Sequence, residues 1–385
     1  MTPASLVAFA QVGAGAAALG FGTWWTLLSV IALPSPRRTT LESGVRFVVI
    51  VPAHNEERLI ATTVASLRAA TYDPSPEILV VADNCSDRTA EVARSAGARV
   101  LERNDPTLRG KSFALDFALD AIRSSTAPPD AVVIVDADTT VDTGFFGALA
   151  ETIERYPVAQ ARYDAAPSQS ELGRMRRVAF NLMHHARPLG AARLGLPTTL
   201  KGNGMAFRWS VVEAGMPGSG ITEDAAATID LASRGLTVRY APNARVSGLM
   251  AEGYAEARTQ DVRWESGRFA LVPGALRVLA TGLRRGEVRA AAAAAEVASP
   301  PLTIVAGWAT LSAVLGLLGF GSLRLGLMGF AGVASYVLVG SVAARTGPRD
   351  ILALLHAPRF IAHKLASYVQ AAVSRPKGWE RTTRG

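Results

Sequence analysis

The sequence predicts an α/β protein with a doubly wound, mostly parallel β-sheet, one transmembrane helix before it, two after it, and interfacial amphipathic helices. Short apolar runs alternate with amphipathic segments from residue 45 to about residue 250. An uncharged stretch precedes this region, and two further apolar stretches follow it. With 49% hydrophobic and only 19% charged residues, the composition is apolar for a purely soluble protein and favours a membrane protein.

Charge and cysteine content narrow the class. The formal net charge of +8 fits loops that face anionic lipid and phosphate-bearing substrates. Nucleic acid is not an expected partner, because no Lys/Arg-rich run is interleaved with aromatic residues. The single cysteine, Cys85, cannot form an intrachain disulfide, and no zinc-ligand spacing is present. The central region therefore fits the reducing cytosol.

The N-terminal part, residues 1–44, is predicted to hold a transmembrane helix. No charged residue occurs from Ser5 to Leu33, and this run exceeds the roughly 20 residues that a spanning helix needs. A cleaved signal peptide is disfavoured, because no basic segment precedes the run and the run is too long. Arg37 and Arg38 follow it, so we expect the N-terminus outside and the next residues inside.

The central part, residues 45–270, is predicted to form the sheet. Its expected strands are apolar runs rich in β-branched residues, at 47–51, 78–81, 98–101 and 131–135. The expected helices between them lie at 56–70, 86–96 and 111–122. This alternation places a site at the carboxyl ends of parallel strands.

The C-terminal part, residues 271–385, is predicted to return to the membrane. Two apolar stretches, Ile304–Phe320 and Leu325–Ala344, predict a hairpin at about 301–344. Three spans would then place the C-terminus inside. The segment Ile351–Val373 is amphipathic and predicts an interfacial helix, and residues 265–295 offer another.

Carboxylates follow two of the predicted strands. Asp136 and Asp138 stand two residues apart, so an extended chain turns both to one face, where they can share a cation. Hard oxygen ligands favour Mg²⁺ or Mn²⁺. The alternative is a pair of turn aspartates, and Asp83 has the same two interpretations.

Two further segments carry charge at predicted helix starts. Lys111 follows Gly110, where a cation and free backbone N–H groups can meet phosphate, unless it is a solvated surface lysine. Glu223 and Asp224 follow a glycine-rich stretch and either cap a helix or supply a general base.

The spacing of Gln260, Arg263 and Trp264 places all three on one helix face. Arg263 can bind diphosphate, and the indole of Trp264 can support a sugar ring. The alternative is that Trp264 anchors the chain at a membrane interface while Arg263 faces lipid.

Five segments in this order resemble the family 2 glycosyltransferases, which are inverting enzymes with a GT-A fold. They are Val51-Pro52-Ala53-His54-Asn55-Glu56, Ala82-Asp83-Asn84, Val135-Asp136-Ala137-Asp138, Thr222-Glu223-Asp224 and Gln260-Asp261-Val262-Arg263-Trp264. The resemblance covers roughly residues 45–270. It is closest to the membrane-integrated branch that includes cellulose, hyaluronan and poly-N-acetylglucosamine synthases and ceramide glucosyltransferases.

The resemblance implies a role for each matching residue. The nucleotide-sugar donor would be bound by Pro52, Ala53, Asn55, Glu56, Asp83, Lys111, Asp136 and Arg263. The acceptor side would comprise Gly202, Asn203, Gly204, Glu223, Gln260 and Trp264. Asp138, with Asp136, would bind Mg²⁺ or Mn²⁺, and Asp224 would be the catalytic base.

The expected activity is an inverting, metal-dependent β-glycosyl transfer from a UDP-sugar at the cytoplasmic face of the inner (plasma) membrane. The acceptor would be a cell-surface polysaccharide or a glycolipid, and membrane lipids, a second copy or a secretion protein would be partners. Single transfer to a membrane lipid remains an alternative, because ceramide glucosyltransferases share the Gln-x-x-Arg-Trp motif. A non-catalytic membrane scaffold on the same fold is a remote one.

Overall fold

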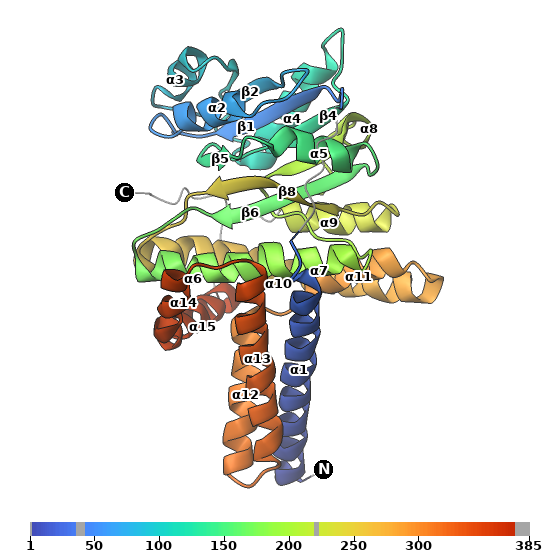
Figure 1. Ribbon diagram of the computed structural model, residues 1–385, viewed down its shortest axis with the longest axis vertical. Helices are drawn as coiled ribbons and strands as arrows, with labels where there is room; N and C mark the ends of the chain where they lie inside the picture. The colour runs from blue at the N-terminus through green and yellow to red at the C-terminus, as the bar shows by residue number, and fades with distance from the viewer. Residues whose placement is uncertain (1, 36–42, 219–222, 374–385) are drawn as a thin grey trace. The chain divides into compact units, whose positions relative to one another are not determined.

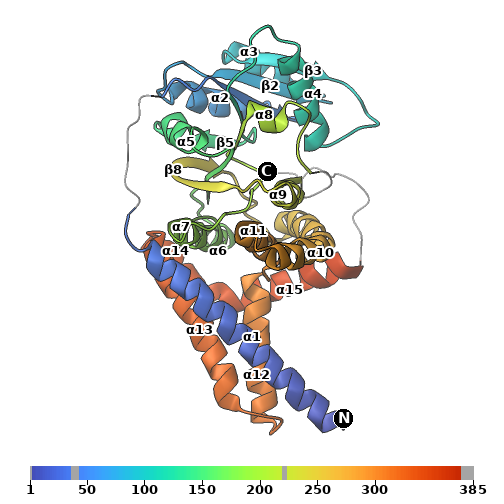
Figure 2. The same cartoon turned by 90° about the vertical axis from the view of Figure 1, so that its right-hand side faces the viewer.

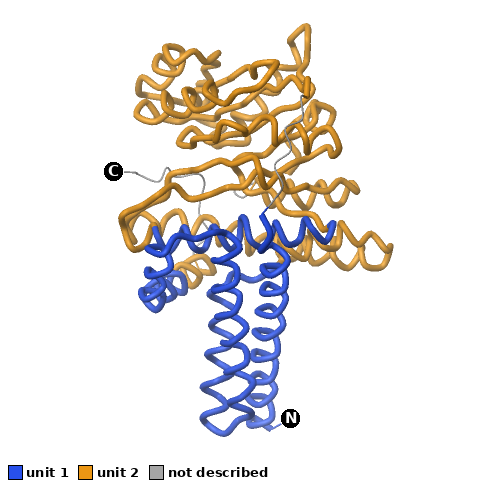
Figure 3. Tube along the Cα trace, viewed as in Figure 1, with its two compact units in different colours: residues 1–35, 174–195, 299–366 blue, residues 36–173, 196–298, 367–385 orange. Residues whose placement is uncertain are grey.

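The structure is a computed structural model that describes residues 2–35, 43–218 and 223–373. The chain divides into two compact units (Figure 3). A helical unit comprises residues 1–35, 174–195 and 299–366, and a sheet unit comprises residues 36–173, 196–298 and 367–385. Residues 174–195 thus join the helical unit and residues 271–298 the sheet unit, so the units are divided differently from the three parts expected from the sequence.

The sheet unit contains an eight-stranded sheet in the order β3-β2-β1-β4-β7-β6-β8-β5 (Figure 1). Four strands in one half are mutually parallel: β1 (Phe47–Ala53), β2 (Glu77–Asp83), β3 (Arg99–Arg103) and β4 (Ala131–Ile134). The other half comprises β5 (Thr139–Val141), β6 (Val158–Ala165), β7 (Met205–Arg208) and β8 (Arg239–Gly248).

The second half of the sheet is mixed, so the expectation of a doubly wound, mostly parallel sheet is met only in part. Strand β7 is antiparallel to both β4 and β6, β6 is parallel to β8, and β5 is antiparallel to β8. Only residues 135–138 separate β4 from β5, which lies at the edge of the sheet beside β8, so no helical crossover of the kind that joins parallel strands connects the two. An uninterrupted run of parallel strands therefore extends over β1–β4 only, and β6 and β8 form a separate parallel pair.

Helices cover both faces of the sheet. One face packs against α2 (Ile60–Ala69), α3 (Thr89–Ser95) and α5 (Phe145–Ile153). The other packs against α4 (Lys111–Arg123) and α9 (Glu223–Ser233). Residues of β1 alternate between these two apolar cores, which explains why the first strands are continuous apolar runs in the sequence.

The sheet unit also contains two long helical segments after the last strand. Helix α10 runs from Tyr254 to Arg285, and α11 runs from Val288 to Ala298. A shorter helix, α8, spans Trp209–Val212.

Three helices form most of the helical unit: α1 (Pro3–Ala32), α12 (Leu302–Leu317) and α13 (Leu323–Ala343), which lie side by side in both views (Figures 1 and 2). Close approach through glycine joins two of them, since a Cβ added to Gly22 would lie 2.7 Å from the backbone of Gly332. The Gln11 amide nitrogen donates to Ser312 and Ser322, which links α1 to the α12–α13 hairpin.

Helices α1 and α13 are each long and apolar enough to cross a membrane. Helix α12 has only 16 residues, and it counts as a third candidate only together with α11, across a bend of 71°. The described residues therefore offer two candidate spans, or three with the bent pair.

The helices after α13 differ from the sequence expectation. Residues 348–373 form α14 (Pro348–Leu352), a 3₁₀ turn (Ala353–His356) and α15 (Ala357–Val373), in place of one continuous interfacial helix. The segment before residue 195 forms α6 (Glu171–Phe180), a π-helical turn (Asn181–Ala186) and α7 (Arg187–Arg193).

Gly204, just before β7, allows a test of how closely the chain packs there against β6 and β8. Its φ of +67° disfavours any side chain, and an added Cβ would lie 3.0 Å from both Ala161 and Val246. We expect Gly204→Ala to destabilise the protein by about 2–4 kcal/mol through strain and overpacking together. Gly235→Ala is the matched control, because its φ is +73° but its surroundings are open. The midpoint of thermal unfolding should fall further for Gly204→Ala, and equal losses would contradict this packing.

Candidate functional site

The predicted site residues of the sheet unit meet at one edge of the sheet. Asp83 ends β2, Asp136 follows β4, and the loop Gly202-Asn203-Gly204 leads into β7. Because β7 is antiparallel to β4, the start of β7 lies where β4 ends, and Gly204 N–H donates to Ile134 O over 2.9 Å. The mixed sheet thus brings the expected acceptor loop beside the aspartate pair.

Asn203 fixes this loop from the inside. Its side chain is fully buried, with Oδ1 accepting from the Asp136 N–H over 3.2 Å and Nδ2 donating to the Thr139 hydroxyl over 2.8 Å. Gln160 Nε2 donates to Asn203 O over 2.8 Å. The Asn203 side chain therefore braces the turn that carries the two aspartates, a role that the sequence did not indicate.

Lys111, the first residue of α4, lies at the centre of the site. Its Nζ donates to Asp136 Oδ1 and to Gly202 O, each over 2.5 Å, so it is not a solvated surface lysine. Burial acts to lower the Lys111 pKa, but the charges of Asp136 and Glu223 outweigh it, and the net pKa is raised. The ammonium therefore stays charged.

Two carboxylates open α9 on the same site. Asp224 Oδ1 accepts from the Ala225 N–H over 2.8 Å, and Oδ2 lies 3.6 Å from the point where a Cβ on Gly202 would be. Burial raises the pKa of Asp224, and it raises the pKa of Glu223 to about 6, while the charge of Lys111 opposes both shifts. Thr222 of the same motif lies outside the described residues.

Arg263 of α10 belongs to the same electrostatic cluster. Burial lowers its pKa, and the charges of Glu223 and Asp136 oppose that change. Gln260 is buried and Trp264 half-buried on the same helix. Two cations and three carboxylates thus act on one another from α4, the turn after β4, α9 and α10.

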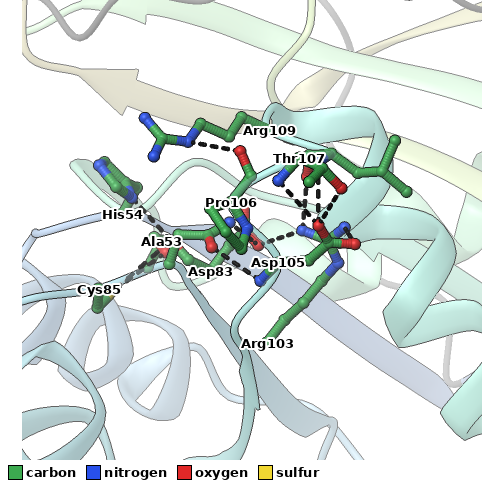
Figure 4. A network of polar contacts seen from close by, with 11 residues as sticks. Ala53, His54, Asp83, Cys85, Arg103, Asp105, Pro106, Thr107 and Arg109 are labelled. Carbon is green, nitrogen blue, oxygen red and sulfur yellow. Dashed lines mark hydrogen bonds and ion pairs between the residues drawn. The ribbon is translucent and has the colours of Figure 1, made fainter.

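The expected nucleoside-binding segments form a second network of polar contacts (Figure 4). Asp83 pairs with Arg103 over 2.7 Å, with about a tenth of each side chain exposed. His54 Nδ1 lies 2.7 Å from Asp83 O, and the Asn55 side chain accepts from the Ser86 N–H over 2.7 Å. Arg103, at the end of β3, was missed from the sequence because its partner lies 20 residues away.

Of the other residues expected on the donor side, Ala53 is buried and Pro52 and Glu56 are half-buried. The Glu56 N–H donates to the Thr89 hydroxyl over 2.8 Å, which ties the end of β1 to the start of α3. These residues therefore lie beside Asp83.

The aspartate pair has a donor set that fits Mg²⁺ or Mn²⁺. No group of three or more His, Cys, Asp or Glu side chains suited to a metal occurs among the described residues. Asp136 Oδ2 has no hydrogen-bond partner in that part of the chain, and half-buried Asp138 accepts from the Thr139 hydroxyl over 3.3 Å. Two carboxylates suit a cation that takes its other ligands from phosphate and water.

Comparison with known proteins identifies the family of this region. The family model described as "Glycosyltransferase like family 2" matches residues 45–267, more than half of the chain. Glycosyltransferase AglD of Haloferax volcanii is 32% identical over 142 residues, covering 34% of this chain and 21% of that protein. The 4,4'-diaponeurosporenoate glycosyltransferase of Staphylococcus haemolyticus is 33% identical over 118 residues, covering 30% of this chain and 29% of that protein. The matches span less than a third of either relative.

Among solved structures, the mannosyltransferase PcManGT of Pyrobaculum calidifontis, in complex with GDP-Man and Mn²⁺, is similar over 96% of this chain and 99% of that chain. The TM-score is 0.58 and the sequence identity 18%, so the likeness concerns the fold. It confirms the expected GT-A-like α/β architecture in its mixed-sheet form.

The raised pKa of Glu223 predicts a pH-dependent cost to stability. Its folded-state pKa of about 6 exceeds the ordinary 4.5, so the folded protein binds the proton more tightly and loses stability as pH rises between these values. Above pH 6 the loss is constant at about 2 kcal/mol. We therefore expect Glu223→Gln to unfold at a higher temperature than wild type at pH 8, with no advantage near pH 4.5. A gain that did not depend on pH would contradict this origin.

Proposed function

Because the chain belongs to glycosyltransferase family 2, we propose that it transfers a sugar from a nucleotide-sugar donor to a saccharide or lipid acceptor, with inversion at the anomeric carbon. The single observation that carries the proposal is the convergence of Lys111, Asp136, Asp224 and Arg263 at one sheet edge. This edge combines the cations that a diphosphate requires with a carboxylate suited to proton transfer.

The donor is held from two sides. The network of Asp83 and Arg103 receives the nucleoside, and Lys111 and Arg263 supply positive charge to the diphosphate. Asp138 and Asp136 would hold Mg²⁺ or Mn²⁺, which, when bound, neutralises charge on the leaving diphosphate. UDP is the nucleoside diphosphate to test first in the donor, and GDP is the second, since the structure of PcManGT contains GDP-Man.

Asp224 acts as the general base. In a direct displacement the acceptor hydroxyl gives its proton to Asp224, its oxygen forms a bond to the anomeric carbon, and the bond to the diphosphate breaks with its electron pair leaving on the phosphate oxygen. Burial raises the Asp224 pKa, which strengthens the carboxylate as a proton acceptor. Glu223, Gln260 and Trp264 line the acceptor side beside it.

The reaction takes place at a membrane, in our proposal at the cytoplasmic face of the inner (plasma) membrane, with the N-terminus outside. The apolar lengths of α1 and α13 support a membrane location. The membrane-integrated branch and a polysaccharide or glycolipid acceptor follow from the motifs. Single transfer to a lipid is the second candidate, because the few candidate spans favour it over a polymer channel and one relative is named for a single acceptor, 4,4'-diaponeurosporenoate.

Asp224→Asn tests the proposed base. We expect the rate of UDP or GDP release from the matching nucleotide sugar to fall about 10²-fold or more, because the amide cannot take the proton, while donor binding is retained. Asp230→Asn, an exposed position on the same helix paired with Arg234, is the control and should keep the wild-type rate. Unchanged turnover in Asp224→Asn would exclude this base, and tight nucleotide binding without turnover of any donor would favour the scaffold alternative.

Metal dependence is tested through nucleotide binding. We expect Mg²⁺ or Mn²⁺ to strengthen UDP or GDP binding to the wild type and EDTA to reverse the gain. In Asp138→Asn, the increase in nucleotide affinity caused by the metal should be smaller by about tenfold or more, since even indirect changes to a metal site have effects of this size. Asp120→Asn, on the exposed side of α4, is the matched control. A gain of the same size in Asp138→Asn would place the metal elsewhere.

A further inference from the structure

A cluster of three charged residues lies at the ends of β6 and β8, and no motif of the sequence includes it. Arg162 Nε donates to both oxygens of Asp164, over 2.8 and 3.0 Å. Arg245 Nε forms an ion pair with Asp164 Oδ2. The Asp164 side chain is only 4% exposed, whereas those of Arg162 and Arg245 are 17% and 49% exposed. One buried carboxylate thus orients two accessible guanidinium groups.

This arginine pair lies beside the proposed active site. Arg162 is two residues beyond Gln160 on the same face of β6, and Gln160 binds Asn203 O and the Lys201 N–H. Across the sheet, Asp164 aligns with Ser247 of β8, which aligns with Thr140 of β5. Two strand spacings place Asp164 roughly 10 Å from Thr140. Asp138 precedes that strand directly, so the pair and the aspartates share one edge.

The terminal nitrogens of both arginines remain available. Each arginine uses only Nε in its ion pair, and among the described residues none of their four Nη nitrogens has a hydrogen-bond partner. Tyr240 of β8 aligns with Gln160 of β6, two residues before Arg162, and its hydroxyl, whose pKa is raised by burial, is within the field of all three charged residues. The cluster is therefore built into the sheet and has donors to spare.

A purely structural role explains why one arginine is paired with Asp164, but it does not explain the second. An ion pair here can hold the irregular register between Ala161 and Arg162, where β6 and β8 shift. One arginine is enough to neutralise Asp164, however, and a second leaves the cluster with a net charge of +1. Paired guanidinium groups with free Nη donors match the oxygens of a phosphate, to which arginine binds in a bidentate manner.

Resting on the proposed function, we infer that Arg162 and Arg245 form a subsite for a phosphate group on the acceptor. The subsite lies at the β6–β8 end of the edge, apart from Lys111 and Arg263, which serve the donor diphosphate. Its ligand is a phosphate monoester, carried either by a lipid or by a soluble acceptor. Binding there would place the acceptor beside Asp224 and select phosphorylated acceptors over neutral ones.

The test uses the full chain in detergent, with the donor site filled by saturating UDP or GDP and Mg²⁺, and calorimetric titration with inorganic phosphate. We expect saturable phosphate binding in the wild type and at least about tenfold weaker binding in Arg245→Gln, from the loss of charge-assisted hydrogen bonds. Arg162→Gln should behave alike, but Arg245→Gln is the decisive variant, because Arg245 is half-exposed and Arg162 still partners Asp164. Nucleotide affinity should not change in either variant.

Arg46→Gln is the matched control, since Arg46 forms a similar exposed ion pair with Asp130 next to the start of β1 and β4, away from the site edge. A second titration with phosphatidic acid in phosphatidylcholine micelles distinguishes the two sources of the phosphate. If phosphatidic acid binds more tightly than inorganic phosphate and Arg245→Gln loses this difference, the ligand is a lipid phosphate. If the two bind equally, the ligand is a soluble phosphate. Wild-type phosphate affinity in Arg245→Gln, or no saturable binding in the wild type, overturns the subsite. If neither nucleotide binds, the proposed function fails, and the phosphate titration still decides the subsite.

Discussion

The site depends on the Lys111 ammonium group, which binds both the turn after β4 and the loop before β7. Lys111 Nζ binds Asp136 Oδ1 after β4 and Gly202 O before β7, and its charge opposes the pKa rise of Glu223 and Asp224. Partly burying two adjacent carboxylates raises the free energy of their charged forms, and a buried cation offsets part of that cost. Without Lys111, the start of α9 could not keep both acidic groups beside the aspartate turn as anions.

The reversal of strand direction at β7 makes this sharing possible. In a fully parallel sheet the segment before β7 would open at the opposite edge from the end of β4, and Gly202 could not reach Lys111. Antiparallel pairing of β4 and β7 brings both to one edge, and fully buried Asn203 locks them together through Asp136 and Thr139. The departure from the predicted sheet is thus the feature that assembles the site.

The strands that could be predicted were those whose sequences are apolar runs. Strands β1, β2 and β4 are buried on both faces, so their apolar runs identified them in the sequence within a few residues. Strand β6, Val158–Ala165, carries Arg162 and Asp164 on its polar face and gave no such signal. Motif residues were found because their spacing is local. Arg103 was not found, and neither were the contacts of Asn203 with Asp136 and Thr139, because the partners come from distant segments and pairing across a fold is invisible in one sequence.

In the proposed function, the parallel half of the sheet carries residues for the donor and the mixed half carries residues for the acceptor. Strands β1, β2 and β4 of the parallel half are tightly buried, and at the carboxyl ends of β2 and β3 Asp83 and Arg103 form the compact network to which the proposed function assigns the donor. The mixed half has a polar face on β6 and β8 that is free to carry Arg162, Arg245 and Tyr240. Changes on this face leave the apolar cores beneath β1–β4 intact. Acceptor recognition can therefore vary on the mixed half while the donor side and the shared lysine stay fixed.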